Sequence, residues 1–339
     1  MRWRLLAFGV LCGILALVGW LYLERAASAP PTRASAIRVV EGPDALARIR
    51  SGPHLVFRNT DQRTGYGRVA LAALDAPEER FVTDLACDRV YVAAEHGICL
   101  VAERDVVTTY EARVLDAALA PGPRISLTGP PSRARVAPDG RRAAFTVFET
   151  GHSYAAADFS TRTTLVDTLT SKSMGDLDGW QVLRDGAPFR AEDFNFWGVT
   201  FAPDGNRFYA TLATGGHFFL VEGDIAARRL RVLRAGIECP SLSPDGRRLA
   251  FKSRRTDAGR LTWGLRVLDL DTGTETALDG ETRSVDDQPA WLDDTHVLYG
   301  LPEERIPATG GGDVWVLETR AGATPRKLLE QAWSPAVVR

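Results

Sequence analysis

The sequence predicts an all-β fold, a six-bladed β-propeller of four-stranded antiparallel blades, preceded by one N-terminal transmembrane helix. Two patterns support this prediction: an uncharged apolar segment near the N-terminus and a Pro-Asp-Gly unit that recurs along the rest of the chain. The 31 glycines and 19 prolines are spread over the 339 residues. Such a distribution is typical of many short turns rather than of one unstructured tract.

The repeated unit consists of a strand, a tight turn and a second strand. Proline presets φ, aspartate bonds back to the backbone and glycine accepts a positive φ, so Pro-Asp-Gly forms the turn. Each unit continues into a further hairpin, as at Asp271-Thr-Gly273, and four antiparallel strands make one propeller blade. Three clear copies and two degenerate ones occur, at Val136–Phe145, Phe201–Ala210, Leu242–Phe251, Trp291–Tyr299 and Leu85–Val92.

The spacing of the units predicts the number of blades and one insertion. The aspartates of the five copies lie roughly 40 to 65 residues apart, and a blade usually takes about 40 to 50. The longest interval predicts an insertion within residues 152–192, with extended hairpins around Thr161–Leu169 and Trp180–Phe189. A further blade before Asp88 makes six. An open ring would expose sheet edges, so we expect residues 335–338 to pair with residues near 54–59.

The N-terminus predicts a membrane anchor. Arg2 and Arg4 precede an uncharged segment from Leu5 to Leu23, which as a helix is about 28 Å long and matches the hydrocarbon thickness. The preceding arginines place residues 1–4 in the cytoplasm and the rest of the chain outside. The predicted domains are therefore a cytoplasmic N-terminus (1–4), a signal anchor (5–23), a linker and lead-in segment (24–53) and the propeller (54–339).

A cleaved signal peptide is the alternative to a retained anchor. Ala27-Ser28-Ala29 has the small-x-small pattern of a cleavage site, but Pro30 follows it and the apolar segment is longer than a usual signal core. The expected location is the plasma membrane, single-pass, with an extracytoplasmic propeller. The alternative is a secreted protein cleaved near residue 29.

The repeated Ser/Ala-Pro-Asp-Gly units resemble those of the TolB-like, WD-type β-propellers. The segments Asp193–Gly205 and Tyr209–Gly216 are similar to actinobacterial proteins of this type, and the resemblance covers about residues 54–339. It implies an extracytoplasmic six-bladed propeller that associates with other envelope proteins. The chain departs from TolB itself, because it has an anchor and no room for a separate N-terminal α/β domain. A Tol–Pal role is therefore not carried over.

A search for catalytic and metal-binding patterns predicts no catalytic residue, no metal site and no cofactor. Gly151-His-Ser-Tyr-Ala155 lacks the final glycine of a nucleophile elbow. The five histidines fall in separate blades without the close spacing of zinc ligands, and two Asp-x-Asp segments near 176 and 269 lack the downstream glutamate of a calcium loop. The formal net charge of −2 gives no basic surface for nucleic acid.

Two cysteines of the second blade are candidates for a disulfide. Cys87 and Cys99 both lie in the part predicted to be extracytoplasmic, where disulfides persist. If Glu95-His96 is the turn between them, Cys99 pairs with Val92 and Cys87 lies several residues away, which argues against the bond. Both outcomes stay open. Cys239 is expected to be a buried thiol.

The loops that lead into the inner strands supply a candidate binding site. In a propeller these loops reach one end of the central channel, and here they bring carboxylates beside an aromatic and an amide. Such an acidic mouth would attract a cation or a basic segment. The alternative is that each carboxylate caps a turn or pairs with a nearby arginine. The candidate residues are Asp193, Asn195, Trp197, Glu238, Asp286 and Asp287.

These patterns favour a membrane-anchored, non-enzymatic protein-interaction or ligand-binding module of the bacterial envelope. Its expected partners are envelope proteins or an extracellular ligand, with the membrane contacted through the N-terminal helix, and we expect a monomer. The alternative is a metal-assisted, lactonase-like hydrolase or a small-ligand receptor at the acidic mouth, which needs three or four ligands that converge on the axis.

Overall fold

The computed structural model describes residues 2–27, 37–151, 154, 159–257, 259–302 and 311–339. The chain forms two compact units, Met1–Ala36 and Ile37–Arg339. In the first unit, helix α1 (Arg2–Ala27) covers the segment predicted as the anchor. Among the described residues, no helix meets the combined length and apolarity expected of a membrane span. The anchor therefore stays a prediction.

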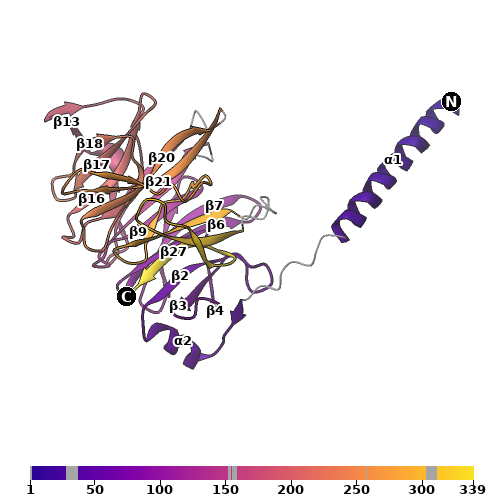
Figure 1. Cartoon of the computed structure of the whole chain (residues 1–339), viewed down its shortest axis with the longest axis horizontal. Helices are drawn as coiled ribbons and strands as arrows, with labels where there is room; N and C mark the ends of the chain where they lie inside the picture. Colours follow the sequence, from indigo (N-terminus) through magenta and orange to yellow (C-terminus); the bar gives the residue numbers. More distant parts are fainter. Residues whose placement is uncertain (1, 28–36, 152–153, 155–158, 258, 303–310) are drawn as a thin grey trace. The chain divides into compact units, whose positions relative to one another are not determined.

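In the described part of the chain, the second unit is a propeller of six blades, each built on four antiparallel strands, as predicted (Figure 1). Their inner strands follow one another around the ring in the order β27, β5, β9, β15, β19, β23. The first three blades consist of β27 (Ala332–Val338), β2 (His54–Asn59), β3 (Arg68–Ala73) and β4 (Glu79–Ala86); of β5 (Arg89–Ala93), β6 (His96–Arg104), β7 (Thr108–Leu115) and β8 (Pro121–Leu127); and of β9 (Pro131–Val136), β10 (Arg142–Thr150), β11 (Ser160–Asp167) and β12 (Lys172–Asp176).

The other three blades follow the same pattern. They consist of β15 (Asn195–Phe201), β16 (Arg207–Thr214), β17 (His217–Asp224) and β18 (Arg229–Ala235); of β19 (Glu238–Leu242), β20 (Arg248–Asp257), β21 (Arg260–Asp269) and β22 (Glu275–Ala277); and of β23 (Ala290–Trp291), β24 (His296–Pro302), β25 (Gly312–Glu318) and β26 (Arg326–Leu329). The Pro-Asp-Gly turns join first to second strands, and Gly140, Gly205 and Gly246 adopt φ values of 72°, 71° and 73° there. These values explain the glycine of the repeat.

The C-terminal strand closes the ring, as predicted. In Figure 1 the yellow β27 lies beside β2, and its register pairs Val338 with His54 and Ala336 with Val56. Arg80 of β4 reinforces the closure from a fully buried position. Its guanidinium donates to Asn59 Oδ1 at 2.7 Å, to Glu330 O at 2.7 Å and to Gln331 O at 3.2 Å. The C-terminal strand β27 is thus fixed to β2 and β4 of the first blade by backbone and side-chain hydrogen bonds.

The propeller unit begins earlier than His54, the predicted boundary. Strand β1 (Arg38–Val39) pairs in parallel with β4 at the outer edge of the first blade. Helix α2 (Pro43–Arg50) follows, and its Ile49 is buried in the core cluster of the first two blades. Residues 37–53, which were predicted as part of a linker and lead-in segment, therefore belong to the folded unit.

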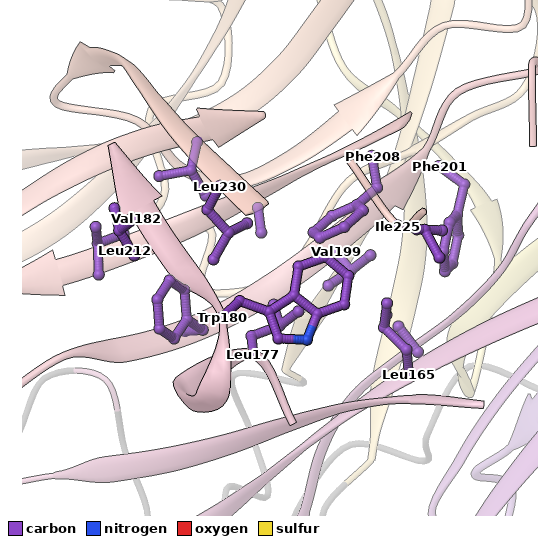
Figure 2. Close-up of a cluster of buried hydrophobic side chains, with 14 of the residues drawn as sticks. Leu165, Leu177, Trp180, Val182, Val199, Phe201, Phe208, Leu212, Ile225 and Leu230 are labelled. Atoms are coloured by element: carbon purple, nitrogen blue, oxygen red, sulfur yellow. The ribbon is translucent and has the colours of Figure 1, made fainter. Parts of the chain in front are cut away.

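The predicted insertion is smaller than expected and contributes to the fourth blade. Helix η1 (Leu177–Gly179) leads into the hairpin β13 (Gln181–Arg184) and β14 (Ala187–Phe189), and β13 pairs with β18 to extend that blade outward. Leu177, Trp180 and Val182 pack into a core cluster shared with the third blade (Figure 2). The Thr161–Leu169 hairpin is wrong as an insertion, because β11 and β12 are the regular outer strands of the third blade.

Candidate functional site: the loop face and the central channel

The propeller has two ends, which differ in the connections that they carry. We call the end with the Pro-Asp-Gly turns the turn face. The opposite end, the loop face, carries the loops that lead into the inner strands and those between second and third strands. All six candidate residues predicted from the sequence lie at or just below the loop face.

Asp193 and Asn195 stabilise local loops of the fourth blade. Asp193 is exposed and accepts hydrogen bonds from Thr214 Oγ1 at 2.5 Å and Gly215 N at 2.6 Å. These bonds hold the pKa of Asp193 below its ordinary value. Asn195 accepts from Thr161 N at 2.7 Å and so joins the fourth blade to the third. The hydrogen bonds of both side chains therefore stabilise the fold.

Trp197 is fully buried rather than at the edge of an open mouth. Its ring lies 5.1 Å from the ring of Tyr154 and 6.0 Å from that of Phe218, measured between centroids. Cys239 is buried in the same cluster. Trp197 is therefore part of an aromatic core below the loop face.

The other three predicted carboxylates come together around the channel, and each has a positively charged partner. Glu238 accepts from Arg254 Nε at 2.7 Å. Asp286 lies 2.5 Å from Lys252 Nζ, and Asp287 Oδ1 lies 3.7 Å from Arg89 Nη1. Glu238 also accepts from Trp263 Nε1 at 3.1 Å, and Asp287 from Gly300 N at 2.9 Å. Each of these three carboxylates therefore has a cation within 4 Å.

The charge balance at this place is the opposite of the predicted acidic mouth. Five cations surround the three carboxylates, so the network carries a net positive charge. The cations come from three different inner or second strands, and they are Arg89, Arg133, Arg135, Lys252 and Arg254. Burial raises the pKa of Asp286, but Lys252 and then Arg133 lower it more, so the pKa falls below its ordinary value. Asp286 is consequently ionised and committed to these cations.

Tyr154 is buried beneath the loop face against the charge network, and the sequence did not single it out for this position. Its hydroxyl lies 2.6 Å from Ser132 Oγ, and its ring lies 4.9 Å from the Arg133 guanidinium and 5.0 Å from Lys252 Nζ. Its neighbours His152 and Ser153, from the incomplete nucleophile elbow, lie outside the described residues. Burial raises the pKa of the Tyr154 hydroxyl above its ordinary value, so it is neutral at physiological pH.

The space left in the channel at this level is too small for an organic substrate. The cavity among the inner strands measures 20 Å³, whereas ligand pockets usually measure about 300–1,000 Å³. Within the parts of the chain that the structure describes, no three His, Cys, Asp or Glu side chains are grouped as a metal would need. This level of the channel is a packed, charged layer.

Cys87 and Cys99 are joined in a disulfide, with their Cα atoms 5.5 Å apart. The expected geometric obstacle does not arise because the hairpin turns one residue earlier than assumed. Ala93 pairs with His96, and Cys99 therefore lies opposite Val90 rather than Val92. The bond ties Cys87, the residue after β4, to β6 in the second blade.

A notch between the first two blades opens on the loop face next to this disulfide. It measures 360 Å³, and its lining combines Tyr66 with charged side chains such as Arg104 and Arg113. The adjacent loop between β6 and β7 exposes 98 % of Val106 and 72 % of Val107. Among the large apolar side chains described in the propeller, only Leu169, on the turn face, approaches this exposure at 63 %.

No family model matches the sequence, and a comparison with curated proteins finds no match. Among solved structures, TolB from Acinetobacter baumannii is similar, with a TM-score of 0.57 and 17 % identity over 87 % of this chain and 70 % of that one. The chain has the fold of a TolB-type β-propeller. A chain of the nidogen/laminin complex is also similar, with a TM-score of 0.55 and 10 % identity over 84 % of this chain and 98 % of that one. Such low identities establish the TolB-type fold alone.

Proposed function

We propose that this TolB-type propeller is a non-enzymatic interaction module of the bacterial envelope. In this proposal residues 5–23 anchor the chain in the plasma membrane, and the loop face binds an envelope protein outside it. One observation carries the proposal: the exposed Val106 and Val107 project beside the notch between the first two blades. Exposed apolar side chains next to a cleft with a charged lining are typical of protein-binding surfaces.

The charge network of the channel supports a binding function over catalysis. Glu238, Asp286 and Asp287 each have a positively charged partner, so their first role is to balance buried cations. A metal-assisted, lactonase-like hydrolase, or a receptor at the mouth, would need these carboxylates to turn toward its ligand. A stoichiometric metal in the purified full-length protein, measured by plasma mass spectrometry, would favour that alternative.

The anchor and the secreted alternative differ in the N-terminus of the mature protein. A retained anchor keeps the protein in the membrane pellet after carbonate washing, with an N-terminus at or near Met1. Cleavage instead leaves an N-terminus near residue 30 and releases the propeller. N-terminal sequencing of protein from both fractions decides between them.

The partner-binding face is tested by placing charges on it. Val106→Asp combined with Val107→Asp should abolish co-purification of the partner with the detergent-solubilised full-length protein, because burying a carboxylate in an apolar contact is costly. Leu169→Asp is the matched control, since it changes an exposed apolar residue on the opposite face. Equal loss with both variants, or no loss with the first, would argue against the loop face as the binding surface.

A further inference from the structure

The central channel contains a small polar chamber whose lining is predominantly cationic. Arg89 of β5 and both Arg133 and Arg135 of β9 line it, and Asp287 supplies the only carboxylate of its lining. On the loop-face side, Tyr154 bonds to Ser132, which is another lining residue. Three guanidinium groups thus line one small space together with a single carboxylate.

The nearest second carboxylate does not balance this charge. Asp286 lies 3.6 Å from Arg133 but 2.5 Å from Lys252, which is itself fully buried. Adding this pair leaves four cations and two carboxylates. Burial and, after it, the adjacent Arg133 lower the pKa of Arg89 to about 10, as expected for like charges held close together. Uncompensated charge of this kind is costly in a protein interior.

The arginines also keep donors that the described part of the chain does not satisfy. Arg133 and Arg135 are each only 6 % exposed, and their Nε–H groups are buried without a hydrogen-bond partner. The Arg89 guanidinium has no hydrogen bond to the described residues, and its ion pair with Asp287 is long at 3.7 Å. Buried unpaired donors are rare in native proteins, and a bound water or ion is a common partner of such donors.

The size of the chamber selects the acceptor. Its volume is 20 Å³, and a cavity needs roughly 10–15 Å³ to hold one water. There is room for one small species but not for phosphate, sulfate or an organic acid. Water would accept hydrogen bonds and leave the excess charge unchanged. A halide ion accepts several N–H donors and also neutralises one positive charge.

We propose that the chamber is a buried site for one monovalent halide ion, chloride under natural conditions, bound by Arg89, Arg133 and Arg135. The ion reaches it from the turn face, where a second cavity of 360 Å³ lies along the axis. Arg135 and Tyr91 line both cavities, and the guanidinium lies 4.4 Å from the ring centroid. The halide supports the propeller core from within and is independent of partner binding at the loop face.

Bromide is the probe for this site. The full-length protein in detergent is heated in buffers of constant ionic strength in which bromide replaces gluconate. A bound ion should raise Tm saturably, by about 2–5 °C at a large excess over Kd. Arg89→Gln should remove the saturable rise, whereas Arg104→Gln, which loses the same charge at an exposed site, should keep it. A similar rise in all three proteins, or none in the wild type, would overturn the proposal.

A second measurement covers the case in which Arg89→Gln does not fold. Anomalous diffraction from wild-type crystals grown in bromide should show a peak in the chamber, within hydrogen-bond distance of at least two of the guanidinium groups. Density of a water alone, or peaks confined to the surface, would refute the site. A chamber peak without any saturable rise of Tm would show binding at crystal concentration only and would also count against the proposal.

Discussion

Replacing Arg80 with methionine tests how strongly the ring is closed. The side chain is fully buried and donates three hydrogen bonds, to Asn59 Oδ1, Glu330 O and Gln331 O. Methionine fills similar space but leaves these acceptors without the donor, and each buried polar group without a partner costs about 1–3 kcal/mol. Since two of the acceptors are only partly buried, we expect Arg80→Met to lower the free energy of unfolding by about 3–5 kcal/mol.

Urea denaturation of the full-length protein in detergent, followed by tryptophan fluorescence, measures this change. Arg48→Met is the matched control, because its ion pair with Glu79 lies at the surface and is worth less than about 1 kcal/mol. If Arg80→Met costs no more than Arg48→Met at equal m-values, the contacts of Arg80 do not contribute to closure, and the physical reasoning is refuted.

Two further predictions concern the disulfide and one buried carboxylate. Replacing Cys87 and Cys99 with alanine opens a loop of sequence separation 12 and should lower the free energy of unfolding by about 3 kcal/mol. The urea midpoint of the variant should be lower than that of the wild type, and a reducing agent should not lower it further. Glu281 accepts bonds from Arg283 and Tyr299, and these bonds hold its pKa below the ordinary value although burial opposes them. Its ionised form therefore stabilises the protein above the unfolded pKa, and this stability is lost as pH falls through the folded pKa. Glu281→Gln should lower the free energy of unfolding by about 2–3 kcal/mol at pH 7. In urea titrations, the difference from wild type should shrink below about pH 4. A difference that does not change with pH would contradict this prediction.

The fold was largely predictable because its signals are local. Each Pro-Asp-Gly turn specifies its own hairpin, and the five copies together with the further blade before Asp88 predict six blades. The closing strand was predictable because an unpaired edge is unfavourable. The start of the folded unit could not be predicted, because the two residues of β1 carry no periodic pattern. Ile49 is buried only because α2 packs against β3, which the local sequence does not indicate.

The candidate site was predicted only in part because its charges meet across blades. The sequence placed Glu238, Asp286 and Asp287 near the channel. The partner of Glu238, Arg254, lies on the next strand of the same blade. The partners of Asp286 and Asp287, Lys252 and Arg89, come from other blades, and Arg89 is far away in the chain. One pattern could have shown the positive charge in advance. In the inner strand Pro131-Ser-Arg-Ala-Arg-Val136, arginine alternates with small residues, and a period of two directs both arginines to one side of the strand.

No such pattern in the sequence indicated the buried position of Tyr154. Tyr154 lies in the connection between β10 and β11, and its burial against Trp197 depends on the way in which the third and fourth blades meet. A lone aromatic in a connection is usually a surface residue or a local packing residue. The contacts of Tyr154 therefore depend on the three-dimensional fold and could not be predicted from the sequence.

Site-specific photo-crosslinking in the native membrane tests the proposed partner binding most directly. A photoreactive amino acid is placed at Val106 on the loop face and, as the control, at Leu169 on the turn face of the full-length protein. We expect position 106 to form a reproducible crosslink to one envelope protein and position 169 to form none. Equal capture at both positions, or capture only at position 169, would contradict a binding surface on the loop face.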